Sequence, residues 1–326
     1  MKLVELQPIE FDNFVKAEPN ASIYQTSNWA KFYSTFSYTP LYIGYVGDNG
    51  VYTAFGLLLV KKGKGFFAKK EAICPCGFLI NYYDSKLLKM FVNDLKVYMF
   101  RKRINKLIIN PNIKYKTRNG NNEYLISVLK DVGFVYTKDN YIYETDISCI
   151  KPYIQKDIIS LNSYVIDSHN IDKLFKINDK YESLYNAFDK KIKFIVCELN
   201  YQASIDSINN AIDENAASDT NNENSLNCEN DSIVKNKENL KLIEKCVDEN
   251  GDNPILGVTC LVEYDSSITQ LCLDIKDGYE TFNIIESLNE KTSQVLNELG
   301  YNSFYGYIPY PESNKIDYIG EFTLNR

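Results

Sequence analysis

Histidine and tryptophan are nearly absent from this chain of 326 residues, which has one of each, His169 and Trp29. A catalytic triad built on histidine would have to use His169, and its setting, VIDSHNIDK, is more typical of a loop or helix cap than of a base. No paired acids are visible either. The closest cysteines, in CPCGF at 74–78, lack the second Cys or His pair that a metal site needs. We therefore predict no metal site and assign no catalytic side chain.

Long apolar segments are also lacking. The longest, AFGLLLV at 54–60, is far shorter than the roughly 20 residues that cross a bilayer. The start, MKLVELQPIEFDNF, has no apolar core of a secretory signal. The eight cysteines are scattered, several within apolar runs such as GVTCLV, which is typical of reduced core cysteines. We expect a soluble cytoplasmic protein without a transmembrane segment.

Charge is unevenly distributed along the chain. Residues 1–150 contain 20 Lys and Arg against 13 Asp and Glu, whereas residues 201–254 contain 4 against 12. A basic N-terminal half permits binding of a phosphorylated ligand or of RNA. A solvated lysine-rich face is the more common interpretation of such an excess.

The acidic segment has few large apolar residues and is dense in Asn, Asp, Glu and Ser. Such a composition buries too little surface to offset the entropy of ordering, so we predict a disordered acidic insert at about 202–253. A short amphipathic helix, NLKLIEKCVDE, is expected to close it. The apolar runs on either side, 193–200 and 254–265, predict a hairpin with the insert at its tip.

The rest of the chain follows one pattern twice: a helix, a meander of three strands, a second helix and a strand. This order predicts an α+β fold with helices packed on mixed sheets. In each half a glycine, Gly133 or Gly300, ends a helix before the next strand. The pattern resembles the acetyltransferase-like (GNAT) unit, so we predict tandem GNAT-like domains at 1–150 and 165–326.

The loop that would bind coenzyme A is missing from both halves. GNAT enzymes hold the pyrophosphate at a helix N-terminus with the backbone of a glycine-bearing loop. Here INYYDS precedes the helix at 84 and KDGYET precedes the helix at 282. We predict no cofactor.

Several segments resemble the FemABX family of peptidoglycan aminoacyltransferases, in the same order. YQTSNWAKFY (24–33) is similar to the family's Q-S/T-x-x-W-x-x-F/Y segment near the N-terminus. The first hairpin, the step before the long helix and the strand end also look like the family's, and weaker likenesses follow towards the C-terminus. These segments are LYIGYVGDNGVYTAFGLLLV, AICPCGFLINYYDSKLLKMFVNDLK, KLIINPNI, ELGYNSFYGYIP and YIGEFTL.

The resemblance implies two GNAT-like domains that act without coenzyme A. It implies transfer of an amino acid from aminoacyl-tRNA to the stem peptide of a UDP-linked or lipid-linked muropeptide precursor. The ester of charged tRNA is already activated, so the enzyme needs no covalent nucleophile and must orient the amine and stabilise the oxyanion.

The resemblance also implies substrate-binding positions: Lys31, Tyr33, Cys76, Asn110 and Lys315. The family's precursor-binding lysine falls near Tyr33. Cys76 stands where the family has the arginine of its P-R-G-P step, and Asn110 where it has an aspartate before proline. Lys315 is the lysine nearest to the family's F-K-x-x-F step.

Two other functions remain open. One is a catalytically inactive paralogue of this fold that binds a precursor or a Fem-like partner protein. The other is an N-acyltransferase that uses a different donor.

Overall fold

The structure is a computed structural model that describes residues 1–63, 69–117, 120–150, 159–218, 234, 236–245, 253–280, 282–307 and 313–325. The chain forms two compact units. Unit 1 comprises Met1–Glu144, Lys173–Lys191 and Asn314–Arg326, and unit 2 comprises Thr145–Asp172 and Ile192–Ser313. The mixed α+β architecture confirms the predicted fold class.

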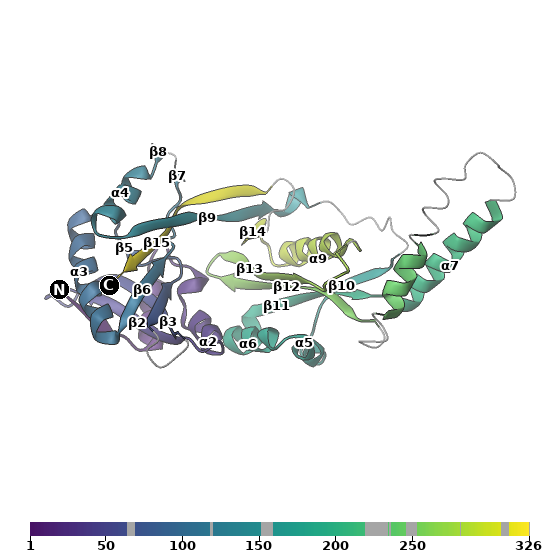
Figure 1. The fold of residues 1–326 in the computed structure, drawn as a ribbon, viewed down its shortest axis with the longest axis horizontal. Helices are drawn as coiled ribbons and strands as arrows, with labels where there is room; N and C mark the ends of the chain where they lie inside the picture. Colours follow the sequence, from purple (N-terminus) through teal and green to yellow (C-terminus); the bar gives the residue numbers. More distant parts are fainter. Residues whose placement is uncertain are drawn as a thin grey trace. The chain divides into compact units, whose positions relative to one another are not determined.

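The strands of unit 1 follow the order β1-β2-β3-β4-β6-β15-β9 in a mixed sheet, and β9 and β15 lie side by side as two long strands (Figure 1). The strands β2, β3 and β4 form an antiparallel meander, β4 and β6 run parallel, and β15 is antiparallel to both β6 and β9. The bounds are β1 Lys2–Glu5, β2 Thr39–Val46, β3 Tyr52–Lys62, β4 Lys70–Cys74, β6 Ile104–Ile109, β9 Val135–Asp146 and β15 Asn314–Asn325. Short pairs are formed by β5 Leu79–Ile80 with β3, and by β7 Lys116–Thr117 with β8 Gly120–Asn121.

Helices cover both faces of this sheet. Strand β3 is buried on both sides, because Leu58 packs with the core under α3 and α4 whereas Leu57 packs with the core under α1 and α2. The helix α3 places five buried apolar residues on one stripe at helical spacing, and this stripe faces the sheet. The bounds are α1 Pro8–Val15, η1 Ile23–Gln25, α2 Ser27–Ser34, α3 Ser85–Lys102, α4 Glu123–Asp131, α5 Ile171–Ile177, α6 Asp179–Phe188 and η3 Asp189–Lys191.

The strands of unit 2 follow the order β14-β13-β12-β11-β10, again with mixed directions. Strands β10 to β13 pair antiparallel and β13 and β14 run parallel. The bounds are η2 Ile147–Cys149, β10 Leu161–Val165, β11 Ile192–Leu199, α7 Tyr201–Ser218, β12 Ile255–Tyr264, β13 Ser267–Ile275, α9 Ile284–Glu298 and β14 Ser303–Gly306. The pairing of β11 with β12 confirms the predicted hairpin.

The two units repeat the predicted pattern, in which an antiparallel meander is followed by a long helix and a strand parallel to the last strand of the meander. The glycine helix ends are confirmed as well. Gly133 and Gly300 have φ values of 104° and 80°. After each glycine, an aromatic residue donates its backbone N–H to the carbonyl five residues earlier, at 3.0 Å for Phe134 and 2.9 Å for Tyr301. This bond pattern is the Schellman motif.

The prediction of disorder over 202–253 is wrong for part of that segment. Residues 201–218 form α7, and residues 236–245 are helical as the NLKLIEKCVDE prediction expected. Ile208 and Ile243 are fully buried in the unit 2 core, and the Tyr279 hydroxyl donates a hydrogen bond to the Leu242 carbonyl at 3.2 Å. A few apolar residues at helical spacing therefore anchor an otherwise polar segment. Residues 219–233, 235 and 246–252 lie outside the described part.

Two segments that the sequence prediction places in the domain at 165–326 belong to unit 1. Lys173–Lys191 packs against α2, where Phe188 meets the Trp29 ring at 6.3 Å between centroids. The C-terminal strand β15 lies between β6 and β9. Pattern alone could not place either segment, because both contacts join residues more than 150 positions apart in the chain.

The predicted strand over 73–82 is also wrong, because the chain turns at Pro75 and divides it into β4 and β5. The strands β1 and β10 were not predicted. His169 lies in the exposed turn before α5, as expected. Of the six cysteines in the described part, 74, 197, 260 and 272 are buried, and none of the six forms a disulfide. In the described residues no helix is long and apolar enough to cross a membrane, and no group of side chains could hold a metal ion.

Candidate functional site

Three connections of unit 1 meet where the parallel strands β4 and β6 end. They are the segment 22–26 before α2, the turn 75–77 after β4 and the segment 110–112 after β6. Because the carboxyl ends of parallel strands lie at the same edge of a sheet, such connections are common places for ligands in α/β folds. We call this set of connections the strand-end cluster.

Gln25 lies at the centre of the strand-end cluster and is fully buried. Its side-chain amide donates to the Gly77 carbonyl at 2.6 Å and, more weakly, to the Cys76 carbonyl at 3.4 Å. The side-chain oxygen, Oε1, is buried and finds no hydrogen-bond partner among the described residues. Gln25 therefore holds the 75–77 turn against the start of α2, while one of its own acceptors remains unused.

Cys76 and Asn110 are brought together by the same cluster. The Cys76 backbone N–H donates to Asn110 Oδ1 at 2.9 Å, and the Cys76 thiol lies 3.5 Å from the Ser22 hydroxyl. Burial raises the pKa of the Cys76 thiol to about 11, partly offset by the Ser22 hydroxyl, so this thiol is protonated at neutral pH. A neutral thiol is a poor nucleophile and a poor metal ligand.

The 75–77 turn has an unusual backbone. Cys76 occupies the left-handed region at φ 57°, at the turn position that normally prefers glycine or asparagine. Gly77 follows at φ 70°, and a Cβ there would lie 2.7 Å from the Pro111 Cα. Only glycine fits the close approach of the two connections.

Lys31 and Tyr33 lie on α2, among aromatic side chains. The Trp29 ring contacts Tyr24, Phe32 and Tyr33 at centroid distances of 4.9, 5.3 and 5.1 Å. Burial, with a smaller contribution from Tyr38, raises the pKa of Tyr33, so its hydroxyl is neutral. The Lys31 ammonium donates to the Asn186 carbonyl, in the last turn of α6. A cation is favourable there because helix C-termini carry partial negative charge.

Lys315 lies in a different part of unit 1, on the ribbon formed by β9 and β15. It pairs with Asp317 at 2.8 Å and its ammonium stands 4.5 Å from the centre of the Tyr141 ring. The hydrogen bond from Lys315 to Asp317 raises the pKa of the ammonium. No hydrogen bond or ion pair in the described chain links Lys315 to the strand-end cluster.

The structure thus joins Cys76 and Asn110 directly, and places Lys31 and Tyr33 on a helix that begins beside them. Sequence reasoning missed Gln25 as a site residue, although it had quoted the motif that contains it. The available signal was position: a glutamine just before a helix cap and four residues before the only tryptophan.

The strand-end cluster offers two partly exposed neutral polar groups, the Asn110 amide and the Cys76 thiol, which Gln25 holds in place from below the surface. Such groups can orient a substrate and stabilise developing charge by hydrogen bonding. They do not supply a base or a covalent nucleophile.

Coenzyme A, which the GNAT architecture implies, does not fit the start of the long helix α3. At the start of α3, the Asp84 carboxylate accepts a hydrogen bond from the Leu87 backbone N–H at 2.9 Å, so an anion already occupies that N-terminus. Before α9, Glu280 accepts from the Gly278 N–H at 3.1 Å. The Asp84 carboxylate would repel a pyrophosphate, which normally binds at such a helix start, whereas Glu280 precedes the α9 cap residue Asn283 and accepts its hydrogen bond outside the helix.

Residues 6–145 match the FemAB family. Four of the five predicted site residues lie within the FemAB segment, as does Gln25, whereas Lys315 lies outside it. No match was found among curated protein sequences.

Solved structures with the same fold extend the comparison to the whole chain. The crystal structure of FemX has a TM-score of 0.62 at 16% identity and covers 100% of this chain and 98% of its own. A tandem GNAT protein from the clavulanic acid biosynthesis pathway has a TM-score of 0.60 at 8% identity, with 99% and 98% covered. A GCN5-related N-acetyltransferase from Sphaerobacter thermophilus has a TM-score of 0.51 at 7% identity, with 99% and 95% covered. These likenesses confirm the predicted tandem GNAT-like fold.

Proposed function

We propose that this protein is a Fem-like aminoacyltransferase. It moves an amino acid from aminoacyl-tRNA to an amino group on the stem peptide of a peptidoglycan precursor, in the cytoplasm where charged tRNA is found. The observation that carries the proposal is the FemAB match over residues 6–145, in a chain whose fold is that of FemX over its full length.

The chemistry of the strand-end cluster is compatible with this reaction. In the transfer, the amine nitrogen of the stem peptide attacks the ester carbonyl carbon, the bond to the tRNA oxygen breaks, and the amine's proton ends on the tRNA hydroxyl. No protein side chain forms a covalent bond with the substrate, so the neutral and partly exposed Asn110 amide is suited to orienting the reactants. The Asp84 carboxylate at the start of α3 disfavours an acyl-CoA donor in unit 1.

The direct test is transfer of a labelled amino acid from charged tRNA to UDP-linked muropeptide. We expect the label to appear in the muropeptide with wild-type protein. Asn110→Ala, which removes the acceptor for the Cys76 N–H, should reduce the rate at least tenfold, because the 75–77 turn loses its link to β6. No transfer by the wild type from any charged tRNA would contradict the proposal.

Precursor binding can be tested separately by calorimetry with UDP-linked muropeptide. If Lys31 contacts the precursor phosphate, Lys31→Ala should weaken binding roughly ten- to a hundredfold, since a charge-assisted hydrogen bond contributes about 1.5–3 kcal/mol. Lys16→Ala is the matched control, because Lys16 is also an exposed lysine of unit 1, at the end of α1. Equal affinity of the wild type and Lys31→Ala would leave Lys31 with the role seen in the structure, that of a contact to α6.

A second candidate is a non-catalytic Fem-fold protein that binds the precursor or a Fem-like partner. It is favoured because the site residues already form hydrogen bonds within the chain, Lys31 with the Asn186 carbonyl and Asn110 with the Cys76 backbone N–H, and these groups are therefore not available to a substrate as they stand. Muropeptide binding without transfer from any charged tRNA would select this candidate.

A further inference from the structure

One end of unit 1 gathers positive charge on three adjacent strands and one helix. Lys62 of β3 pairs directly with Lys70 of β4, and Lys70 pairs with Ile104 of β6, which follows Arg103. Arg101 lies in the last turn of α3 and is exposed. Like charges directly opposite on neighbouring strands are destabilising, so Lys62 and Lys70 raise the energy of this rung in the absence of an anion.

The outer face of α3 continues this basic end with exposed apolar side chains. Val97 is 50% exposed, and Phe100, one turn further on, is 62% exposed. Met90, two turns before Val97 on the same stripe, is 40% exposed. We call Lys62, Lys70, Val97, Phe100, Arg101 and Arg103 the α3 end patch.

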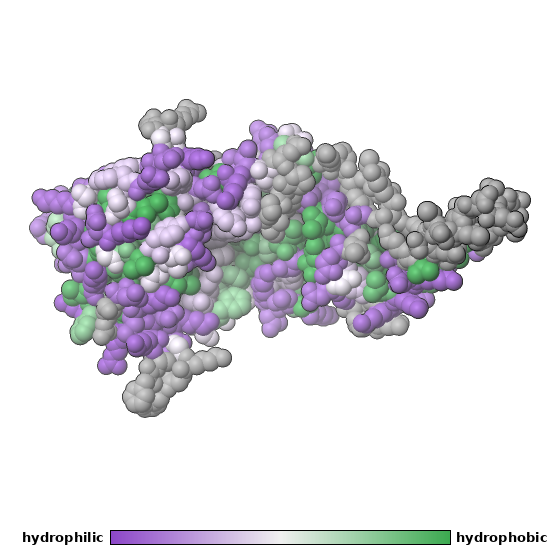
Figure 2. All heavy atoms as spheres, turned by 45° about the horizontal axis from the view of Figure 1, so that its top comes forward, coloured by the Kyte–Doolittle hydropathy of each residue, from purple (hydrophilic) through white to green (hydrophobic). Residues whose placement is uncertain are grey.

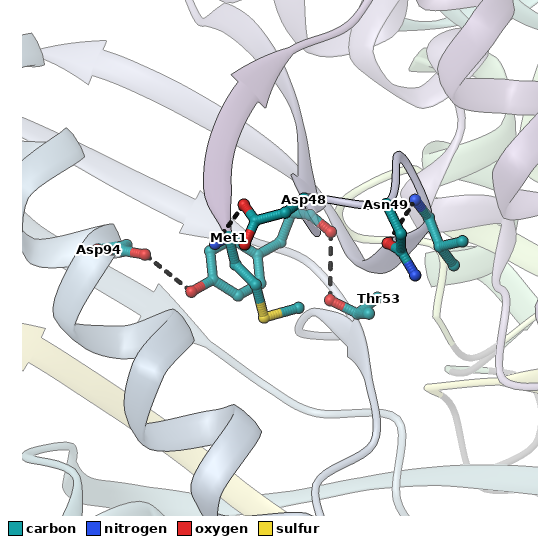
Figure 3. A network of polar contacts seen from close by, with 7 residues as sticks. Met1, Asp48, Asn49, Thr53 and Asp94 are labelled. Carbon is teal, nitrogen blue, oxygen red and sulfur yellow. Dashed lines mark hydrogen bonds and ion pairs between the residues drawn. The ribbon is translucent and has the colours of Figure 1, made fainter.

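Acidic groups that could neutralise the α3 end patch are turned elsewhere. Asp94 is the only acidic residue of α3, and its carboxylate accepts the hydroxyl of Tyr45 at 2.8 Å on the inner side of the helix (Figure 3). Glu5 is paired with Lys102 at 2.5 Å. Glu71 lies opposite Lys61, one rung inward from Lys62 and Lys70. The patch keeps its charge although the whole chain carries a net charge of −7.

The mixture of side chains decides which kind of partner fits. A protein interface typically has an apolar centre depleted of lysine, whereas here cations are interspersed with single apolar groups. The face drawn in Figure 2 likewise shows hydrophobic residues in small groups among hydrophilic ones. Phe100 is the one ring among the six patch residues, whereas proteins that bind single-stranded nucleic acid stack successive bases on several rings. Cations with interleaved apolar side chains match the headgroup region of an anionic membrane, which attracts the charges and accepts the apolar groups.

We propose that the α3 end patch docks unit 1 on the surface of a bilayer containing anionic lipid. The docking goes beyond the proposed transfer reaction, because it requires neither tRNA nor muropeptide. It would hold the protein at the surface where a lipid-linked acceptor would be presented.

The test is cosedimentation of the full-length protein with vesicles of phosphatidylcholine alone or with 30 mol% (about a third) phosphatidylglycerol, without tRNA or muropeptide. We expect binding to the anionic vesicles only, weakening as salt rises because these charges are exposed. Each cation near an anionic surface contributes about fivefold to the partition coefficient, so Lys62→Gln/Arg101→Gln should reduce it about 25-fold. Val97→Ser should reduce it severalfold.

The matched control is Lys16→Gln/Lys116→Gln, which removes two exposed lysines of unit 1 outside the patch. It should bind anionic vesicles nearly as well as the wild type. Circular dichroism melting of each variant checks that folding is intact, which is expected because Lys62 and Arg101 are exposed.

Three results would overturn the proposal. The first is failure of the wild type to bind anionic vesicles at 0.1 M salt. The second is equal loss of binding in the patch and control variants, which would show a general charge effect. The third is evidence that the patch binds something other than a bilayer. Such evidence would be dissociation of a wild-type dimer by Val97→Ser, or loss of tRNA binding in Lys62→Gln/Arg101→Gln while vesicle binding is unchanged. None of these outcomes changes the transfer by the wild type to the water-soluble UDP-linked acceptor, so the two proposals fail separately.

Discussion

Substitution of Gln25 tests whether the strand-end cluster is held together as the structure shows. Gln25→Met keeps the shape of the side chain and removes its donors to Gly77 and Cys76. The Gly77 carbonyl retains the Cys74 thiol as a donor, at 3.1 Å, and the unpartnered Oε1 disappears. Loss of one buried hydrogen bond with this partial compensation should lower the free energy of unfolding by about 1–2 kcal/mol, independently of pH.

Gln25→Glu should behave differently, because its effect depends on protonation. A carboxylate at this fully buried position would face the Gly77 oxygen and be repelled, whereas a protonated carboxyl can donate in place of the amide. The folded state therefore raises the pKa of the introduced carboxyl, and stability is retained below its unfolded pKa and lost as pH rises. The maximum loss grows by about 1.36 kcal/mol per pH unit above about 4.3, to about 1 kcal/mol at pH 5 and 3.7 kcal/mol at pH 7.

The assay is urea unfolding at pH 5, 6 and 7, with each variant compared with the wild type at the same pH. Trp29 fluorescence is the natural probe, because Trp29 is the only tryptophan and its ring contacts Tyr24, next to Gln25. The reasoning would be refuted by a loss for Gln25→Glu that stays below about 1 kcal/mol at pH 7, which would mean that the position is open to water.

Three further experiments test other parts of the structure. Gly77→Ala should lower the free energy of unfolding by about 2–4 kcal/mol, because it adds backbone strain and a close contact. Gly50→Ala, at a position with φ 78° and no atom near its Cβ, should lower it by only about 1–2 kcal/mol. Equal losses in urea unfolding would show that the close contact at Gly77 is harmless. Ile208→Ala and Ile243→Ala should each cost about 2–5 kcal/mol because both side chains are fully buried in unit 2, and unchanged circular dichroism melting would return the segment to the status of a dispensable insert. Cys76 should react with iodoacetamide only as pH rises towards its pKa of about 11, so rapid labelling of this residue at pH 7, located by mass spectrometry, would contradict its burial.

Local pattern predicted much of the fold. The apolar run in 51–60 predicted β3, which is buried on both faces, and the spacing of Leu88, Phe91 and Leu95 predicted α3. Gly133 and Gly300 marked helix ends because each adopts a positive φ, a conformation that residues with a side chain rarely adopt. These features depend on neighbours within a few residues, so they can be recognised in the sequence.

Features that depend on distant residues escaped prediction. The position of β15 between β6 and β9 is set by backbone hydrogen bonds that any extended segment can make. The sequence of β15 therefore does not indicate which strands it pairs with. Ile208 and Ile243 order their helices because they pack into the unit 2 core. The average composition of the segment does not show that these two residues reach a core. Gln25 is recognised as a site residue only when the carbonyls of the 75–77 turn are seen beside it.

The discontinuity of unit 1 has a consequence for biosynthesis. Strand β15 fills the place between β6 and β9 and consists of Asn314–Asn325, so a ribosome that has finished β9 must still make most of unit 2 before that strand exists. At about 5–20 residues per second, the nascent chain waits roughly 10–35 s with β6 and β9 unpaired along those edges. During translation the exposed edges are a hazard for pairing with other chains. Premature termination just before residue 314 would therefore release a protein whose first unit is open at its centre, although nearly all of its sequence has been made.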